Sequence, residues 1–404
     1  MPAKTKITRL YIAFQFFFDL LVWLPVFYEY QRRMGLSDGE ILSIQSVYYL
    51  SFCFLEIPTG YLADRFGYRQ SMRAGSLIFV LANVLVLTLT TYWTFLAHFL
   101  FIALSRSLIS GAANAYLYES LKMFGAKDEY RNTEGKARAY GLVGKVASWM
   151  AVGTLMSWHI TLPYLITALA GITSFIIATY LPVLPADLRL SRLVRKHAAI
   201  LDSKVVLTYL FKSPYLFLIV IQGVGIFMLG RLQVTFFQPI LADKGFDATA
   251  FGWIMAIMTL FEALGSAKSN WLAKRITPLN AVFILTAGIA LSFLGLSFSG
   301  KFGAAVGFSI FAYLIGLAFP IQKELLNNAI TESGYRATIL SIESMVDRGL
   351  SAWCISLFAN MVGAGEISLM LNWAAIVTLA TTLLLYLVFR YGLKTRAVAA
   401  QSIL

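Results

Sequence analysis

Long apolar runs separated by short polar segments follow one another along the whole chain. Each run is close to the length of about 20 residues that a helix needs to cross the hydrocarbon core of a bilayer. The runs therefore predict twelve transmembrane helices. The predicted spans are residues 8–31, 39–61, 72–91, 94–118, 139–157, 161–182, 213–241, 249–268, 279–298, 303–325, 338–361 and 368–390.

The longest polar stretch, residues 183–212, divides the chain into two halves of six spans each. We expect an N-terminal six-helix bundle over 1–182, a basic cytoplasmic linker over 183–212 and a C-terminal six-helix bundle over 213–404. The halves share a weak repeat, in which Gly35-Leu36 matches Gly245-Phe246 and Leu62-Ala-Asp-Arg65 matches Leu272-Ala-Lys-Arg275, both 210 residues later. The fold class predicted is an all-α membrane protein of two pseudo-symmetric six-helix bundles.

Composition agrees with a lipid environment. Hydrophobic residues make up 59% of the chain and charged residues 13%, and the mean hydropathy is +0.73, whereas soluble domains are about one-quarter charged. The net charge of +13 is unevenly distributed: 25 of the 33 basic residues fall in alternate loops, at the two termini and at the adjoining ends of the spans, and only four fall in the opposite loops. This bias predicts that both termini are cytoplasmic. It indicates contact with anionic lipid and argues against nucleic-acid binding.

The loop after the second predicted span carries the most specific motif, Gly60-Tyr-Leu-Ala-Asp64-Arg65-Phe-Gly67-Tyr-Arg69. Gly67 can supply the positive φ of a tight turn, and Asp64 can accept hydrogen bonds from helix N-termini or arginines. The motif resembles the signature of the major facilitator superfamily. The resemblance implies the twelve-helix fold of that family, with Asp64 in a latch that breaks when the transporter changes state.

Weaker features bear on the branch of the family. The stretch Ser110-Gly-Ala-Ala-Asn-Ala-Tyr-Leu-Tyr-Glu119 resembles bacterial efflux-type members. The fifth span departs from the antiporter pattern, because it has no Gly-Pro pair and carries Lys145 where a small residue is expected. This departure leaves import open beside export.

Ionisable residues inside spans are functional candidates, since each costs about 2.5 kcal/mol or more to insert. In the first half, Asp19 lies mid-span and shares the helical spacing of Gln15 and Trp23, while Arg106 lies mid-span in the fourth helix together with Asn114. In the family's layout these two helices line a central cavity. We expect Asp19 to carry a proton and Arg106 to modulate it, with Gln15, Trp23 and Asn114 in the substrate cavity; the alternative is a static ion pair.

In the second half, Glu343 and Asp347 are one helical turn apart, and both cannot stay ionised cheaply in a low dielectric. We predict that one is protonated or paired, with Arg231, Lys145 or Arg348 as the candidate cation. Both carboxylates are assigned to proton coupling. Arg231, Lys145 and Glu262 are assigned to the substrate cavity.

The predicted function is secondary active transport by alternating access in the bacterial inner membrane. We expect a monomer that exports an amphipathic organic compound, such as a drug-like molecule or a siderophore, in exchange for protons. The alternatives are a proton-coupled importer and, from another class, a polytopic membrane enzyme or a non-transporting receptor. No phosphate-binding Gly-Lys-Ser/Thr loop and no histidine cluster occurs in the sequence, so we expect no cofactor, no metal site and no enzymatic activity.

Overall fold

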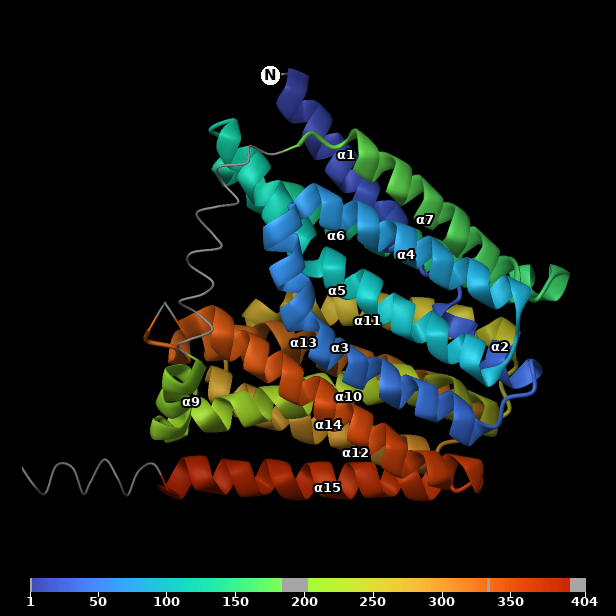
Figure 1. Cartoon of the computed structure of the whole chain (residues 1–404). Coiled ribbons are helices and arrows are strands. Elements are labelled where there is room, and N and C mark those ends of the chain that lie inside the picture. Colours follow the sequence, from blue (N-terminus) through green and yellow to red (C-terminus); the bar gives the residue numbers. More distant parts are fainter. Residues whose placement is uncertain (1, 184–202, 333–334, 393–404) are drawn as a thin grey trace, which may run out of the picture. The chain divides into compact units, whose positions relative to one another are not determined.

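The computed structural model describes residues 2–183, 203–332 and 335–392, and over these ranges the chain is helical, without a β-strand (Figure 1). The helices before residue 184 are α1 (Pro2–Phe18), η1 (Leu24–Val26), α2 (Phe27–Arg33), α3 (Asp38–Phe66), α4 (Tyr68–Thr88), α5 (Tyr92–Met123), η2 (Lys127–Glu129), α6 (Tyr130–Trp158) and α7 (Leu162–Tyr180). Those that follow are α9 (Ser203–Lys212), α10 (Pro214–Asp243), α11 (Ala248–Ala273), α12 (Pro278–Phe298), α13 (Lys301–Ala329), α14 (Arg336–Gly363), α15 (Ile367–Leu387) and η4 (Val388–Gly392).

Every predicted span has a helical counterpart, which confirms the all-α membrane architecture. In the described part of the chain, 8 helices are long and apolar enough to cross a membrane: α4, α5, α7, α10, α11, α12, α13 and α15 with its continuation. Helices α3, α6 and α14 also have the length; charged side chains interrupt the apolar runs of α6 and α14, whereas those of α3 lie toward its two ends. The first predicted span differs most, because it is divided into α1 and α2.

The chain separates into two compact units, one formed by 1–200 with 247–256 and the other by 201–246 with 257–404. In the first unit, α4 packs against α5 and α7, and α1 packs against α6 and α7 (Figure 1). In the second unit, α12 packs against α13 and α15, and α10 packs against α13 and α14. Of the predicted basic linker, 184–202 lies outside the described residues and the remainder includes α9.

The internal repeat seen in the sequence has a structural counterpart at the ends of α2 and α10. Gly35 and Gly245 have φ of 93° and 81°, which glycine adopts without steric penalty. The amide of Leu36 donates to the carbonyl of Gln31, and the amide of Phe246 donates to that of Leu241. These are the six-to-one bonds of a Schellman motif. Both halves therefore end the last helix of their first span with the same backbone turn.

Backbone contact between α11 and α13 depends on two glycines. A Cβ on Gly316 would collide with the carbonyl of Glu262, and a Cβ on Gly265 would collide with the carbonyl of Tyr313. Small residues at a crossing let two helices in a membrane approach closely, which strengthens their dispersion contacts. The α11–α13 contact is therefore specific to glycine at these positions.

Replacing Gly316 by alanine is expected to destabilise the protein by about 1–3 kcal/mol, because the added methyl group forces α11 and α13 apart. Thermal unfolding in detergent, followed with a thiol-reactive dye on the free Cys53 and Cys354, measures the effect. Gly225→Ala is the matched control, since nothing lies within 4 Å of a Cβ at that position. Equal melting temperatures for the two variants would contradict the close crossing.

Candidate functional site

The first membrane span is broken at the depth where its acidic residue lies. Helix α1 ends at Phe18 and helical structure resumes at Leu24, which leaves residues 19–23 outside regular helix. Asp19 is the first residue of the break. The prediction of one continuous helix over 8–31 is therefore wrong. The four-residue spacing still relates Gln15 and Asp19, because the amide of Asp19 donates to the carbonyl of Gln15 at 2.9 Å, but the expectation that Trp23 shares their helical face is wrong.

Pro25 gives the physical reason for the break. Proline has no amide hydrogen and its ring clashes with the carbonyl four residues earlier, which here belongs to Leu21. That carbonyl instead accepts hydrogen bonds from the indole Nε1 of Trp149, on α6, at 2.8 Å and from the amide of Leu24 at 3.3 Å. The amide of Val22 donates to Oγ1 of Thr167, on α7, at 3.1 Å. Side chains from two neighbouring helices thus satisfy backbone groups that lipid cannot.

Trp23 lies in the packed interior of the first unit, where only 2% of it is exposed. Its Nε1 donates to Oδ1 of Asn83 at 2.8 Å, and its ring stacks on Tyr164 with centroids 5.5 Å apart and an interplanar angle of 5°. The predicted role of Trp23 in stacking on a ligand is therefore corrected: it is a core residue that fixes the broken segment against α4 and α7.

Asp19 forms its ion pair with Lys145 of α6, at 3.8 Å between Oδ1 and Nζ. Neither side chain is fully buried, since 30% of Asp19 and 25% of Lys145 are exposed. The face of α6 opposite Asp19 carries Gly141, where a Cβ would lie 3.6 Å from Oδ2. A small residue at 141 thus leaves room for the carboxylate between the two helices.

Arg106, the predicted partner of Asp19, makes no ion pair with it within the described residues. Its guanidinium lies 6.0 Å from the ring centroid of Phe18, and its buried Nη1 has no hydrogen-bond partner in the described part of the chain. Asn114 is half-buried two turns further along α5. The structure therefore brings Asp19 to Lys145, with Arg106 on the adjacent aromatic ring.

A line of polar contacts continues from Asp19 along the boundary of α1 and α6. Gln15 donates to the hydroxyl of Tyr11 at 3.1 Å, and that hydroxyl donates to Glu134 at 2.8 Å. Lys4 and Glu129 pair at 2.6 Å nearer the N-terminus of α1. Tyr11, Gln15 and Asp19 are spaced by four residues, so one stripe of α1 faces the charged stripe of α6.

In the second unit, Arg231 of α10 binds Asp347 of α14 through two parallel bonds of 2.5 and 2.9 Å. This confirms that Asp347 is paired and selects Arg231 from the three candidate cations. Asp347 is 2% exposed. A bidentate pair between a guanidinium and a carboxylate is geometrically specific, and this one joins two helices across the unit.

Glu343 lies one turn before Asp347 and is 3% exposed. Its Oε1 is buried without a hydrogen-bond partner among the described residues, close to Gly223 on α10 and Gln322 on α13. The amide of Gln322 is held by the Ile219 carbonyl at 2.8 Å. A buried, unpaired carboxyl is cheapest in its neutral form. Glu262, predicted to line the substrate cavity, has an exposed side chain on α11.

The signature motif occupies the end of α3 and the start of α4. Gly67 joins the two helices with a φ of 94°, as its sequence context predicts. The guanidinium of Arg69 donates to the carbonyl of Thr179 and so ties α4 to α7. Arg65 is exposed beside the Phe66 ring, and Gly60 lies within α3. The side chain of Asp64 lies outside the described residues, so its part in a latch stays a prediction.

Sequence reasoning missed the residues that hold the break, namely Asn83, Trp149 and Thr167. Each is a polar atom on an otherwise apolar helix, and single polar atoms of this kind are too common to predict a partner. Pro25 was the available signal, since an interior proline leaves one carbonyl in need of a donor. The Tyr11–Glu134 bond had no signal in the sequence beyond the spacing of Tyr11 from Gln15 and Asp19.

Two compact helical units, with charged side chains and a broken helix within the spans, are typical of the membrane transporters that carry solutes. The model of the Major Facilitator Superfamily matches residues 10–347, and the chain belongs to this family of transporters. The Uncharacterized MFS-type transporter YxaM of Bacillus subtilis (strain 168) is 24% identical over 351 residues, covering 80% of this chain and 85% of that protein.

Solved structures share the fold at low sequence identity. The nucleoside transporter NupG has a TM-score of 0.77 at 14% identity, covering 97% of this chain and 100% of that one. A peptide transporter POT in complex with sulfate has a TM-score of 0.73 at 13% identity, covering 96% and 94%. At these identities the similarity establishes the fold of the chain, which agrees with the predicted family.

Proposed function

We propose that this transporter couples the movement of an amphipathic organic solute to protons, and that it does so by alternating access. The ion pair of Asp19 and Lys145 beside the broken first span is the observation that carries the proposal. Discontinuous helices in transporters supply substrate and ion sites near the midplane. Irregular backbone at membrane depth is tolerated where it is buried in protein or lines a water-filled cavity.

The coupling step proposed is protonation of Asp19. Both members of the pair are partly exposed, so that a proton or a polar group of the cargo can reach them. A proton on Asp19 removes its charge and so ends its electrostatic attraction to the ammonium of Lys145. Lys145 then binds an anionic or polar group of the cargo, or the pair re-forms when the proton leaves. Arg106 modulates this exchange through its charge.

In the second half, we propose that Glu343 carries a proton while Arg231 and Asp347 hold α10 to α14. What supports this division is the contrast between the two carboxylates: Asp347 is bonded twice to a guanidinium, and Oε1 of Glu343 is buried without a hydrogen-bond partner among the described residues. Aromatic rings near charges, such as Phe227 beside Phe319 and Lys323, favour a cargo with both apolar and polar parts.

We propose export as the direction, in a bacterial inner membrane with both termini cytoplasmic and with a monomer as the working unit. Import of a small organic solute is the second candidate. It is favoured by α6, which contains no proline and places Lys145 beside the break, unlike the antiporter pattern. The two directions differ in the sign of the accompanying proton movement.

Proteoliposomes that enclose a pH-sensitive dye test the coupling and its direction together. Labelled amphipathic compounds are added outside, and uptake and lumenal pH are followed in parallel. Cargo entry coupled to antiport makes the lumen more alkaline, and symport makes it more acidic. Cargo uptake without any change in lumenal pH would reject proton coupling. Lys145→Gln is expected to reduce the pH change, whereas Lys136→Gln, an exposed lysine of the same helix, is the matched control.

A further inference from the structure

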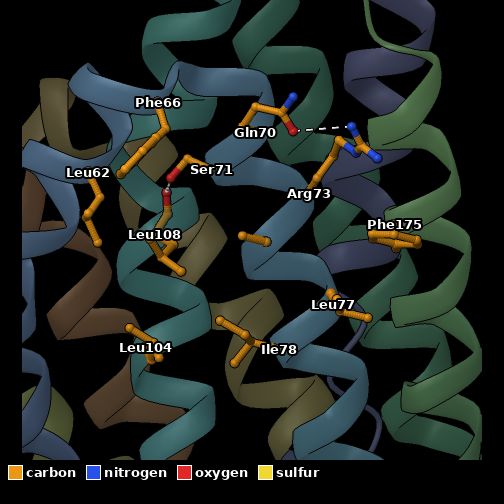
Figure 2. A pocket seen from close by; sticks show the side chains of 11 residues that line it. Leu62, Phe66, Gln70, Ser71, Arg73, Leu77, Ile78, Leu104, Leu108 and Phe175 are labelled. Atoms are coloured by element: carbon orange, nitrogen blue, oxygen red, sulfur yellow. Dashed lines mark hydrogen bonds between the residues drawn. The ribbon is translucent and has the colours of Figure 1, made fainter.

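A cavity of about 710 Å³ opens in the first unit, away from the ion pair of Asp19, among α3, α4, α5 and α7 (Figure 2). The start of α4 supplies Gln70 and Arg73 at one end of it, and Leu77, Ile78 and Leu104 lie toward the other end. The α4 residues that line it are spaced by three and four, so one face of this helix is directed to the cavity.

The polar end of the cavity presents an incompletely satisfied guanidinium. Nη1 of Arg73 donates to Oε1 of Gln70 at 3.2 Å (Figure 2), while its buried Nε has no hydrogen-bond partner in the described part of the chain. Arg73 is five residues from Tyr68, the first residue of α4, and so lies about 8 Å along the helix. The first turn of a helix also carries partial positive charge. This end of the cavity favours an anion.

The remainder of the cavity is apolar and open. Leu62, Phe66 and Leu77 line it with 38%, 53% and 45% of their surfaces exposed. Ala74 is exposed between Arg73 and Leu77 and keeps the centre of the cavity clear. A cation at the end of the span, followed by apolar side chains deeper along the same helix, matches the order of headgroup and acyl chain in a membrane lipid.

We propose that this cavity binds an anionic phospholipid, with its phosphate against Arg73 and one acyl chain along Leu77, Ile78 and Leu104. Charge complementarity selects an anionic headgroup, because the guanidinium has donor capacity to spare and Arg69 of the same helix adds a second positive charge nearby. The bilayer in which a member of this family resides supplies such a lipid. The site is separate from the proposed coupling of cargo to protons, so either proposal can fail without the other.

Native mass spectrometry of the detergent-purified protein with added phosphatidylglycerol or phosphatidylcholine tests the site. The wild type is expected to retain phosphatidylglycerol over phosphatidylcholine. Arg73→Gln is expected to weaken phosphatidylglycerol retention about fivefold, the effect of one basic residue at an anionic surface. Ala74→Phe fills the apolar part from an exposed position and is expected to weaken retention of both lipids. Arg275→Gln is the control, since this arginine lies in the second unit, 4.2 Å from the Trp271 ring.

Melting temperatures show whether each variant is folded before lipids are compared. Equal retention of phosphatidylglycerol by wild type, Arg73→Gln and Ala74→Phe would overturn the proposal. If inorganic phosphate displaces the lipid and Ala74→Phe has no effect, the cavity binds a free anion, and the lipid site is rejected. If Arg275→Gln loses as much phosphatidylglycerol as Arg73→Gln, the lipid is attracted by the protein's overall positive charge. That result would also reject a lipid site in the cavity.

Discussion

Replacing Asp19 by asparagine is expected to abolish proton-driven accumulation of cargo while leaving exchange of cargo across the membrane intact. Asparagine keeps the size of the side chain beside Gly141 and Lys145 but can neither load nor release a proton. With one proton per cargo molecule, a pH gradient of one unit sustains an accumulation ratio of about ten. The variant should show a ratio of about one in the same proteoliposomes.

Glu129→Gln is the matched control for this experiment. It removes another carboxylate of the α1–α6 boundary, the one paired with Lys4, from an exposed position near the end of the span. Accumulation by this variant should equal that of the wild type. A wild-type accumulation ratio in Asp19→Asn would show that the pair with Lys145 is structural, and the coupling role would pass to another carboxylate.

Removing the carboxylate of Asp347 is expected to destabilise the second unit, because it breaks the bidentate pair between α10 and α14. Asp347→Ala leaves the guanidinium of Arg231, 28% exposed, without its bidentate partner. Removing one partner of a hydrogen-bonded ion pair inside a protein costs about 3 kcal/mol, which lowers the melting temperature of a large chain by about 5 °C. Thiol-dye unfolding in detergent measures the shift.

The double variant Arg231→Met, Asp347→Leu distinguishes the contribution of the two charges from that of the volume of the two side chains. It removes both charges and keeps side chains of similar volume, so it should recover most of the stability that Asp347→Ala loses. Its transport activity then reports whether the pair serves only to hold α10 to α14. If Asp347→Ala melts at the wild-type temperature, the bidentate bond does not stabilise the unit.

The spans could be predicted from the sequence because lipid imposes a simple length and an apolar composition. The matching ends of α2 and α10 could also be predicted, since Gly35 and Gly245 recur at one offset and both adopt positive φ. The break in the first span escaped prediction for the opposite reason. Hydropathy continues unchanged through Leu20, Leu21 and Val22, and only Pro25 signals that the helix cannot continue there.

Within the candidate site, the sequence predicts which charged residues matter but only part of their pairing. Arg231 is one of the three cations predicted to pair with Glu343 or Asp347, because two carboxylates one turn apart demand a cation. The predicted pairing of Asp19 with Arg106 rests on their depth and on the family's layout of the first and fourth helices. The pair with Lys145 depends on which faces α1 and α6 turn to each other, and the residues that fix this rotation, such as Tyr11 with Glu134, follow no local pattern.

The carbonyl of Leu21 constrains how the first span can travel during transport. Pro25 supplies no amide hydrogen to that oxygen, which accepts from the indole of Trp149 on α6 at 2.8 Å and from the amide of Leu24 at 3.3 Å. The first span and α6 are thereby joined at a second point besides the charges of Asp19 and Lys145. Sliding of the first span past α6 would have to break both contacts, so we expect these two elements to move together during transport.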